Sequence, residues 1–397
     1  NSSGICPLGI LPCDIFFIIF DIILNCFSKR FKFCTSVPDP NEILFLLDPL
    51  IISGPCSAET YDQLRETCKQ LKSHGINLMR AGVWKPRTRP GTFEGNGEDA
   101  LKWIADIKEE LGVQFTVEVA NTSHIELALK YGIDILWIGA RTTVNPFSVQ
   151  EIADAIKGTD TPVLIKNPIN PDLSLWMGAL ERINTAGITK MGAIHRGFSM
   201  TGKSKYRYVP MWKIAIDLKS NMPNLPVICD PSHICGNRDM IFETSQKALD
   251  LGYDGLIIES HIDPDNAWSD AKQQVTPDVL SKIKSDLKVK TKKEDDKSYK
   301  HLLDEIREGI DDVDKEIVDI ISKRIELVKK IGEFKKEQDL TTFQVDRWNE
   351  VFKSRIDWAI EKGLEKDFIE DLYKVIHLGS INVQNKIINK KKANSKI

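Results

Sequence analysis

Four residues in the middle of the chain, Cys56, His233, Glu259 and Asp270, each stand where an apolar run gives way to a polar stretch. Thiol, imidazole and carboxylate groups form a mixed set of borderline and hard ligands, which suits manganese, iron, cobalt or zinc better than magnesium. Taken singly, such a cysteine is more often a small buried group and such a histidine a structural one. Their shared position predicts a divalent-metal site.

Positively charged side chains occupy the same kind of position. Seven of them follow apolar runs: Arg80, Lys85, Arg87, Arg89, Arg141, Lys166 and Arg196. The first four fall within ten residues of one another, in a segment that Pro86 and Pro90 stiffen. A single surface Lys or Arg is usually solvated, but so many at equivalent positions predict a substrate with several anionic groups, phosphate among them.

The elements that must position these residues alternate regularly. Short runs rich in β-branched residues recur from residue 50 to 261, each followed by an amphipathic stretch of helix length. This alternation is typical of an α/β protein with a (β/α)8 TIM barrel, whose chemistry collects at the carboxyl ends of the strands. The predicted strands are Leu50–Pro55, Ile76–Val83, Phe115–Val119, Ile135–Gly139, Pro162–Lys166, Met191–His195, Val227–Asp230 and Gly255–Glu259.

Six motifs between about residues 50 and 285 resemble the 3-deoxy-D-arabino-heptulosonate 7-phosphate (DAHP) synthase family. They are GPCSAE at 54–59, KPRT at 85–88, GAR at 139–141, HRG at 195–197, DPSH at 230–233 and IESH at 258–261. That family joins phosphoenolpyruvate to erythrose 4-phosphate in the first step of the shikimate pathway. A sister synthase that uses arabinose 5-phosphate typically carries Asn-Arg-Ser where this chain has KPRT, so the loop favours the DAHP enzyme.

The resemblance implies roles for the candidate residues. The metal ligands are expected to be Cys56, His233, Glu259 and Asp270, and the residues that hold phosphoenolpyruvate Arg80, Lys85, Arg141, Lys166 and Arg196. Arg87 and Thr88 are expected to bind the aldose phosphate, whose aldehyde the metal polarises. Lys85, Arg87 and His233 are the expected catalytic residues of this part of the chain.

A second pattern begins at His301 and runs to about Lys336. Its apolar residues step by three or four and no proline intervenes: Ile306, Ile310, Val313, Ile317, Ile320, Leu327 and Ile331. The spacing predicts one amphipathic helix about 50 Å long, the core of a small all-α domain. Because helices in small monomeric domains are usually shorter, a partner chain is expected to cover it, which predicts a homodimer or higher homo-oligomer.

Two cations, Arg324 and Lys335, interrupt the apolar pattern of this helix. They lie about 20° apart around the helix and therefore share one face. Arg307 lies about 100° away from Arg324, so we expect it to serve the neighbouring subunit's site. The apolar periodicity by itself favours an alternative, a dimerising helix in which the long side chains of these cations extend from the apolar contact into solvent.

The spacing of Arg307, Arg324, Lys335, Arg347 and Gln384 is similar to that of the all-helical chorismate mutases, over residues 301 to about 390. IREGIDDVDKEI and SINVQ carry the same resemblance. It implies rearrangement of chorismate to prephenate by positioning and electrostatics, with no cofactor. The partner chain's Arg307 and this chain's Arg324 are expected to bind the carboxylates, Lys335 and Gln384 to donate to the ether oxygen, and Arg347 to complete the cationic lining.

This chain departs from the mutase pattern at Gln344 and Trp348, where acidic residues are common in that family. These departures affect the usual contact to the substrate hydroxyl, for which Glu350 and Asn349 are candidates to compensate. The alternative is a non-catalytic dimerisation module that senses prephenate and regulates the barrel.

Composition and cysteine usage restrict the kind of protein and its compartment. The net charge of −3, with 28% charged residues, shows no basic excess of the kind that nucleic-acid binding requires. Four of the eight cysteines lie in the first 34 residues, and the later ones lack disulfide-like spacing. We therefore expect a reducing compartment and a cytoplasmic enzyme.

The chain divides into five expected parts. An apolar leader at 1–49 precedes the barrel at 50–284, and a charged linker at 285–300 precedes the helical domain at 301–390 and a basic tail at 391–397. Residues 8–27 could attach to a membrane, but Asp14 and Asp21 interrupt them and the positive residues follow rather than precede. The whole predicts a bifunctional enzyme with feedback by prephenate.

Overall fold

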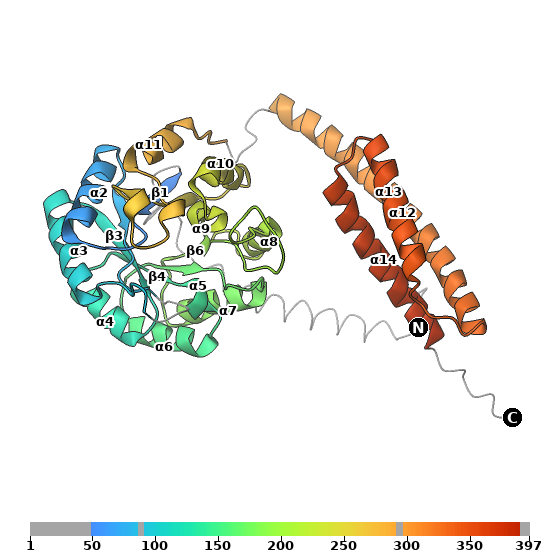
Figure 1. Cartoon of the computed structure of the whole chain (residues 1–397), viewed down its shortest axis with the longest axis horizontal. Helices are drawn as coiled ribbons and strands as arrows, with labels where there is room; N and C mark the ends of the chain where they lie inside the picture. The colour runs from blue at the N-terminus through green and yellow to red at the C-terminus, as the bar shows by residue number, and fades with distance from the viewer. Residues whose placement is uncertain (1–48, 86–90, 291–296, 390–397) are drawn as a thin grey trace, which may run out of the picture. The chain divides into compact units, whose positions relative to one another are not determined.

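The computed structural model describes residues 49–85, 91–290 and 297–389 (Figure 1). These fall into two compact units, Asn1–Lys292 and Lys293–Ile397, which we describe separately. Residues 1–48 of the predicted leader, the basic tail and the loop residues Arg87, Thr88 and Arg89 lie outside the described residues. Within the described part, no helix combines the length and apolar character needed to cross a membrane.

The first unit is a closed barrel of eight parallel strands in chain order, which confirms the predicted fold class. The strands are β1 Leu50–Gly54, β2 Leu78–Arg80, β3 Gln114–Val119, β4 Ile135–Ile138, β5 Val163–Lys166, β6 Met191–His195, β7 Val227–Cys229 and β8 Gly255–Glu259. The barrel closes where β1 pairs with β8, with Gly54 opposite Glu259. The predicted second strand was too long, because only Leu78–Arg80 forms the ladder.

Helices surround the strands, as Figure 1 shows. They are α2 Tyr61–Ser73, α3 Glu98–Leu111, α4 Thr122–Lys130, α5 Ala140–Thr143, α6 Pro146–Ile156, α7 Leu173–Thr185, α8 Trp212–Asn221, α9 Pro231–Cys235, α10 Ile241–Asp250 and α11 Pro277–Asp286, with the short 3-10 turns η2 Arg238–Met240, η3 Pro264–Asn266 and η4 Ala271–Gln273. Several begin at a side chain that accepts a backbone N–H bond, as Thr60, Asn121 and Asp172 do.

Alternation along the strands builds two apolar layers. Every strand except β3 contributes to one apolar layer, which consists of Leu50, Ile52, Leu78, Ile135, Trp137, Leu164, Ile194, Ile228 and Ile257. The other face of the strands packs against the helices. Because both faces are buried, most strands read as continuous apolar runs, and their charged side chains lie at or near the carboxyl ends. The packed interior holds the strand ends, and hence the site, in place.

The imidazole of His195, at the end of β6, is fully buried within an aromatic group. Its ring lies 5.4 to 6.2 Å from the rings of Trp176, Phe198, Trp212 and Tyr253, and its Nδ1 lies 2.8 Å from the Tyr253 hydroxyl. Burial in this setting lowers the pKa of His195 to about 4 from its ordinary 6.5. The folded barrel therefore holds this imidazole neutral at pH values where the unfolded chain protonates it.

We expect the stability of the barrel to fall as the pH drops from about 6.5 to about 4. In that range the unfolded chain binds a proton at His195 that the folded chain does not, and the full effect is about 3 kcal/mol. In a His195→Asn chain, whose amide keeps a partner for Tyr253 but does not titrate, this part of the slope disappears. Denaturant unfolding of both chains at several pH values measures it; equal slopes would contradict it.

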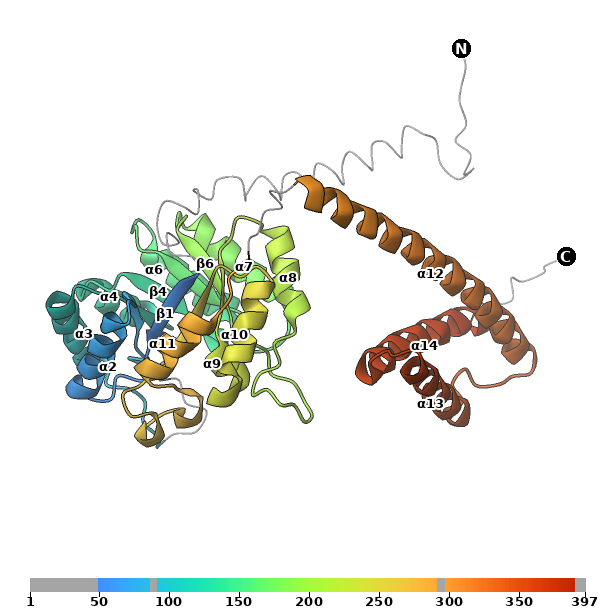
Figure 2. The same ribbon diagram turned by 90° about the horizontal axis from the view of Figure 1, so that it is seen from above.

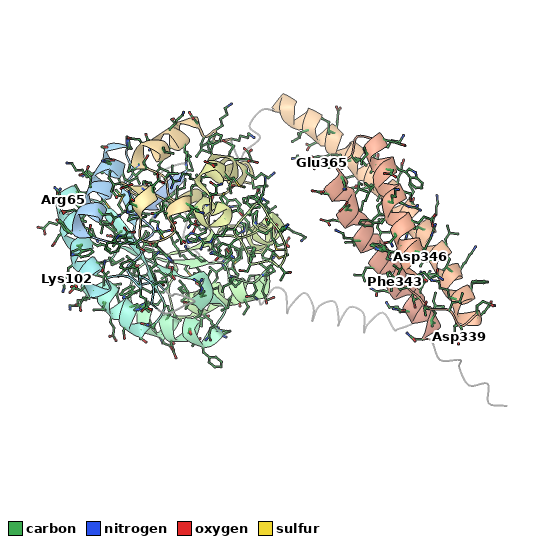
Figure 3. The ribbon with its side chains drawn as sticks, in the orientation of Figure 1. Arg65, Lys102, Asp339, Phe343, Asp346 and Glu365 are labelled. Carbon is green, nitrogen blue, oxygen red and sulfur yellow. The ribbon has the colours of Figure 1, made fainter. Side chains whose placement is uncertain are left out.

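The second unit consists of three helices, α12 Lys297–Glu337, α13 Val345–Glu361 and α14 Lys366–Ile388. α14 packs along both α12 and α13. Figure 2 shows the first half of α12 extending beyond the other two helices, and Figure 3 labels Asp339 and Phe343 in the connection between α12 and α13. The all-helical region predicted after the barrel is thus confirmed.

The expected linker at 285–300 overlaps helices at both ends. α11 continues to Asp286, and α12 begins at Lys297 rather than His301. The segment lacks apolar periodicity, but lysine has a good helix propensity and can extend a helix whose later turns are packed. At 41 residues, α12 is about 60 Å long.

Candidate active site

Three of the four predicted metal ligands meet at the mouth of the barrel. Cys56, Glu259 and Asp270 each offer one ligand atom, and these atoms lie within 4.8 Å of one another. Cys56 follows β1 and Glu259 ends β8, so the pairing of these two strands brings them together. Asp270 precedes η4 with a backbone φ of 45°, a left-handed conformation that a non-glycine residue adopts only when its surroundings hold it.

The fourth predicted ligand, His233, lies in α9 just beyond β7, with its Nε2 3.8 Å from Glu259 Oε1. Asp230 caps α9 by accepting a bond from the His233 backbone N–H, and its Oδ2 lies 2.8 Å from the imidazole Nδ1. Burial lowers the pKa of His233, which keeps the ring neutral. A ring that donates its Nδ1 proton to Asp230 turns the Nε2 lone pair toward Glu259, the orientation a metal ligand needs.

The Cys56 thiol is surrounded by charge. It lies 2.9 Å from Lys85 Nζ, which donates to it, and 3.5 Å from Asp270 Oδ2. Burial, with Glu259 adding to it, raises the pKa of the thiol to about 11, although Lys85 opposes the shift. Two carboxylates beside a thiol therefore disfavour one another's ionisation, a crowding that a bound divalent cation relieves. The donor set fits a borderline metal.

Arginines compensate the two carboxylates. Arg80 Nη1 lies 3.0 Å from Glu259 Oε1 in a fully buried ion pair, and Arg80 lowers the pKa of Glu259 against the effect of burial. Arg207 Nη1 lies 3.0 Å from Asp270 Oδ1. Burial raises the pKa of Asp270, but Arg207 and then His233 bring it down to about 2. Both carboxylates are therefore ionised at neutral pH.

Beside these ligands lies a cavity of about 220 Å³. Its lining consists of Arg80, Gly82, Trp84, Lys85, Glu118, Trp137, Arg141, Arg196, Arg207, Tyr208, His233 and Asp270. Four predicted cations therefore face one cavity. Lys166 is the fifth cation expected to hold the same substrate, but it does not line the cavity. Its side chain is buried, with Nζ 3.1 Å from Asp230 Oδ2.

The sequence pattern missed several residues of this site. Arg207 and Tyr208 come from the segment between β6 and α8, where Arg196 Cζ lies 3.5 Å from the centre of the Tyr208 ring. Gln273 donates to Glu259 Oε2 at 2.7 Å. None of them follows a strand directly, so strand-end position could not find them. Asp230 could have been found from the sequence, because it is the last residue of a predicted strand.

The helical unit brings together part of the second predicted set. Arg324 Nη1 donates to Ser380 Oγ at 2.6 Å across the contact between α12 and α14, and Lys335 Nζ donates to the Thr342 carbonyl at 2.6 Å. Burial lowers the pKa of both cations. Gln384 is buried in α14 and packs close to Gly332, where an added Cβ would lie 3.3 Å from Gln384 Cα.

Two further predicted residues lie at the surface of this unit. Arg347 is paired with Glu350 at 2.7 Å, and Arg307 is 3.2 Å from Asp304. Both side chains are more than half exposed. Within the one chain, therefore, neither joins Arg324 and Lys335.

The two departures from the mutase pattern have distinct surroundings. Gln344 lines a cavity of about 370 Å³ together with Lys335, Phe334 and Leu340. Trp348 packs against His377 of α14, with ring centres 4.2 Å apart. Of the two candidates to compensate for the affected contact, Glu350 is engaged by Arg347, and Asn349 lines a different cavity.

A (β/α)8 barrel whose mouth combines metal-type ligands with a cationic cavity defines a class of enzymes that act on small anionic substrates. The chain belongs to the DAHP synthetase I family, whose model matches residues 47–295. The model of the chorismate mutase type II family matches residues 306–385. The chain thus carries a DAHP synthase domain, a transferase, followed by a chorismate mutase domain, an isomerase.

Known proteins that are similar to this chain include two kinds of aldolase. The phospho-2-dehydro-3-deoxyheptonate aldolase of Thermotoga maritima is 31% identical over 238 residues, which cover 60% of this chain and 68% of that protein. Its crystal structure aligns with a TM-score of 0.54 at 29% identity, over 59% of this chain and 67% of that one. The 2-dehydro-3-deoxyphosphooctonate aldolase of Wolinella succinogenes is 26% identical over 262 residues, 58% of this chain and 95% of that protein.

Proposed function

We propose that the barrel condenses phosphoenolpyruvate with erythrose 4-phosphate and water to give DAHP and phosphate. The observation that carries this proposal is the meeting of Cys56, Glu259 and Asp270 beside a cavity lined by several cations. Both substrates are anionic, and one must present its aldehyde to a Lewis acid. The KPRT loop favours erythrose 4-phosphate over arabinose 5-phosphate as the aldose.

In this proposal each group at the mouth has a defined task. Cys56, His233, Glu259 and Asp270 would hold manganese, iron, cobalt or zinc, which when bound supplies Lewis-acid polarisation of the aldehyde. The phosphate and carboxylate of phosphoenolpyruvate are assigned to Arg80, Lys85, Arg141, Lys166 and Arg196. Arg87 and Thr88 are assigned to the aldose phosphate. Asp230 holds His233 and Lys166 in place through the contacts described above.

Removing the metal tests the barrel. We expect dialysis against a chelator to lower the synthase rate by about 10²- to 10³-fold, because Lewis-acid stabilisation contributes several kcal/mol. Chorismate turnover by the same sample should not change. Re-addition of metal should restore wild-type synthase but not a Cys56→Ala chain, measured as metal bound per chain and as rate. Cys68→Ala, a buried cysteine of α2, is the matched control. A chelator-resistant synthase would sink the proposal.

We also propose that the helical unit rearranges chorismate to prephenate. Arg324 and the partner chain's Arg307 bind the two carboxylates, Lys335 and Gln384 donate to the ether oxygen, and Arg347 adds to the cationic lining. In the structure Arg324 and Lys335 lie on the side of α12 that faces α14, where Ser380 and Gln384 are buried. Positioning and electrostatic stabilisation require no metal.

A homodimer, or a higher homo-oligomer, accounts for the apolar surface of α12. Ile306, Ile310, Val313 and Ile317 are each between 48% and 54% exposed in the single chain. A helix that presents such a stripe requires a partner to cover it. We place the enzyme in the cytoplasm. We assign residues 50–284 to the barrel domain and residues 301–390 to the mutase domain.

Prephenate is the proposed feedback effector of the barrel, because the chain joins the first step of a pathway to a branch point. We expect prephenate to lower the synthase rate of the intact chain several-fold at concentrations that saturate the mutase site. Unchanged synthase kinetics would end this idea. The runner-up function, a non-catalytic sensing module, is favoured by Gln344 and Trp348 and requires that the intact chain leave chorismate unconsumed.

A further inference from the structure

The helical unit contains a histidine that has no role in the mutase resemblance or in the assignments above. His377 lies in the middle of α14, and its Nε2 is enclosed with no hydrogen-bond partner among the described residues. Gln384 Oε1, two turns further along the same helix, is likewise enclosed and unpartnered. Buried polar atoms are nearly always hydrogen-bonded, so two unpartnered atoms on one helix point to a missing polar ligand.

The position of His377 on its helix points to the mutase site. His377 and Gln384 are seven residues apart and therefore lie about 20° apart around α14, with Ser380 on the same side. Ser380 is the partner of Arg324, and Gln384 is the proposed donor to the ether oxygen. His377 thus shares the face of α14 that looks toward the cations of α12.

Aromatic rings hold the imidazole in place. Trp348 of α13 lies 4.2 Å from it, centre to centre, at an interplanar angle of 44°, and Phe343 lies 6.1 Å away, nearly edge-on. Trp348 stands where an acidic residue is common in the mutase family. An indole supplies no acceptor for a substrate hydroxyl, but it fixes a ring that can.

The charges around His377 determine its protonation state. Burial lowers the pKa of His377, and Arg324 and Lys335 of α12 lower it further. The ring is therefore neutral at neutral pH, with one nitrogen that donates and one that accepts. A neutral group is suited to an uncharged polar part of the substrate rather than to a carboxylate.

We propose that His377 contacts the substrate of the mutase, with its Nε2 hydrogen-bonded to the hydroxyl group of chorismate and its ring held by Trp348. This rests on the proposed mutase function. Arg324 and the partner chain's Arg307 are assigned to the carboxylates, and Lys335 and Gln384 to the ether oxygen, so the hydroxyl is the polar group left without a partner. Because a hydroxyl both donates and accepts, it satisfies Nε2 in either tautomer.

The test compares two substrates in the full-length chain: chorismate and an analogue that lacks the hydroxyl. His377→Phe keeps a ring for Trp348 but removes the polar atom. We expect it to lower kcat/KM for chorismate about tenfold or more, and kcat/KM for the analogue less than twofold. His377→Gln, whose amide reaches the place of Nε2, should stay within about threefold of wild type for chorismate.

Lys374→Ala, an exposed residue of the same helix, is the control and should match wild type on both substrates. Equal losses on both substrates in His377→Phe would make the histidine structural and overturn the proposal. If His377→Phe does not unfold cooperatively, His377→Leu and His377→Gln carry the same comparison. A wild-type chain that leaves chorismate unconsumed would instead refute the mutase function itself, and with it this role.

Discussion

A Lys335→Ala chain is expected to consume chorismate about 10²- to 10³-fold more slowly than wild type, measured by the loss of chorismate's ultraviolet absorbance. Lys335 is 8% exposed and its Nζ is held by the Thr342 carbonyl, so the ammonium is already positioned before substrate arrives. Removing one preorganised donor to charge that develops in a transition state typically has an effect of this size.

The control is Lys329→Ala, which removes an exposed lysine of the same helix that is paired with Glu326. It should leave turnover unchanged, and the synthase rate of both variants should equal that of wild type. If Lys335→Ala turns over chorismate at the wild-type rate, the assigned site is wrong. If the wild-type chain shows no turnover, the helical unit is a regulator.

The same variant tests the dimer. If each site takes Arg307 from the partner chain, a mixture of inactive Lys335→Ala and Arg307→Ala chains forms heterodimers with one intact site. Random exchange of subunits should restore about a quarter of the wild-type rate. A mixture that stays inactive after full exchange would show that both residues serve one site in the same chain.

An Asp230→Asn chain is expected to lose about 3–5 kcal/mol of barrel stability and to bind metal about 10- to 100-fold more weakly. Asp230 is fully buried between Lys166, 3.1 Å away, and the imidazole of His233. Burial by itself raises the pKa of Asp230, but His233, and to a smaller extent Lys166, hold that pKa well below its usual range. Asparagine fills the space but leaves the buried ammonium unpaired.

Denaturant unfolding and calorimetric titration of metal into the stripped chain measure the two effects. Asp217→Asn, which loses a surface pair with Lys213, is the matched control and should change stability by less than about 0.5 kcal/mol. An Asp230→Asn chain with wild-type stability would show that Lys166 finds another partner or loses its proton at little cost.

Some of this architecture could be predicted from local pattern. Strands buried on both faces read as apolar runs, so their number, order and polar ends were visible, and with them Cys56, Glu259 and the cations of the mouth. The apolar spacing along α12 likewise predicted a long helix with an uncovered face. Motif resemblance added the two enzyme classes, which the family comparisons confirm.

Other features depend on which distant segments meet. The pairs Arg207–Asp270, Gln273–Glu259 and Lys166–Asp230 each join segments that are far apart in the chain or that have no periodicity of their own. The contact of Trp348 with His377 joins two helices, and the spacing of residues within either helix does not predict it. The sequence by itself determined the barrel, the helices and the residue types at their ends, because these depend on local burial and propensity. Only the tertiary structure decided which charges are paired and which polar atoms are left for a ligand, because pairing depends on distances between residues far apart in the chain.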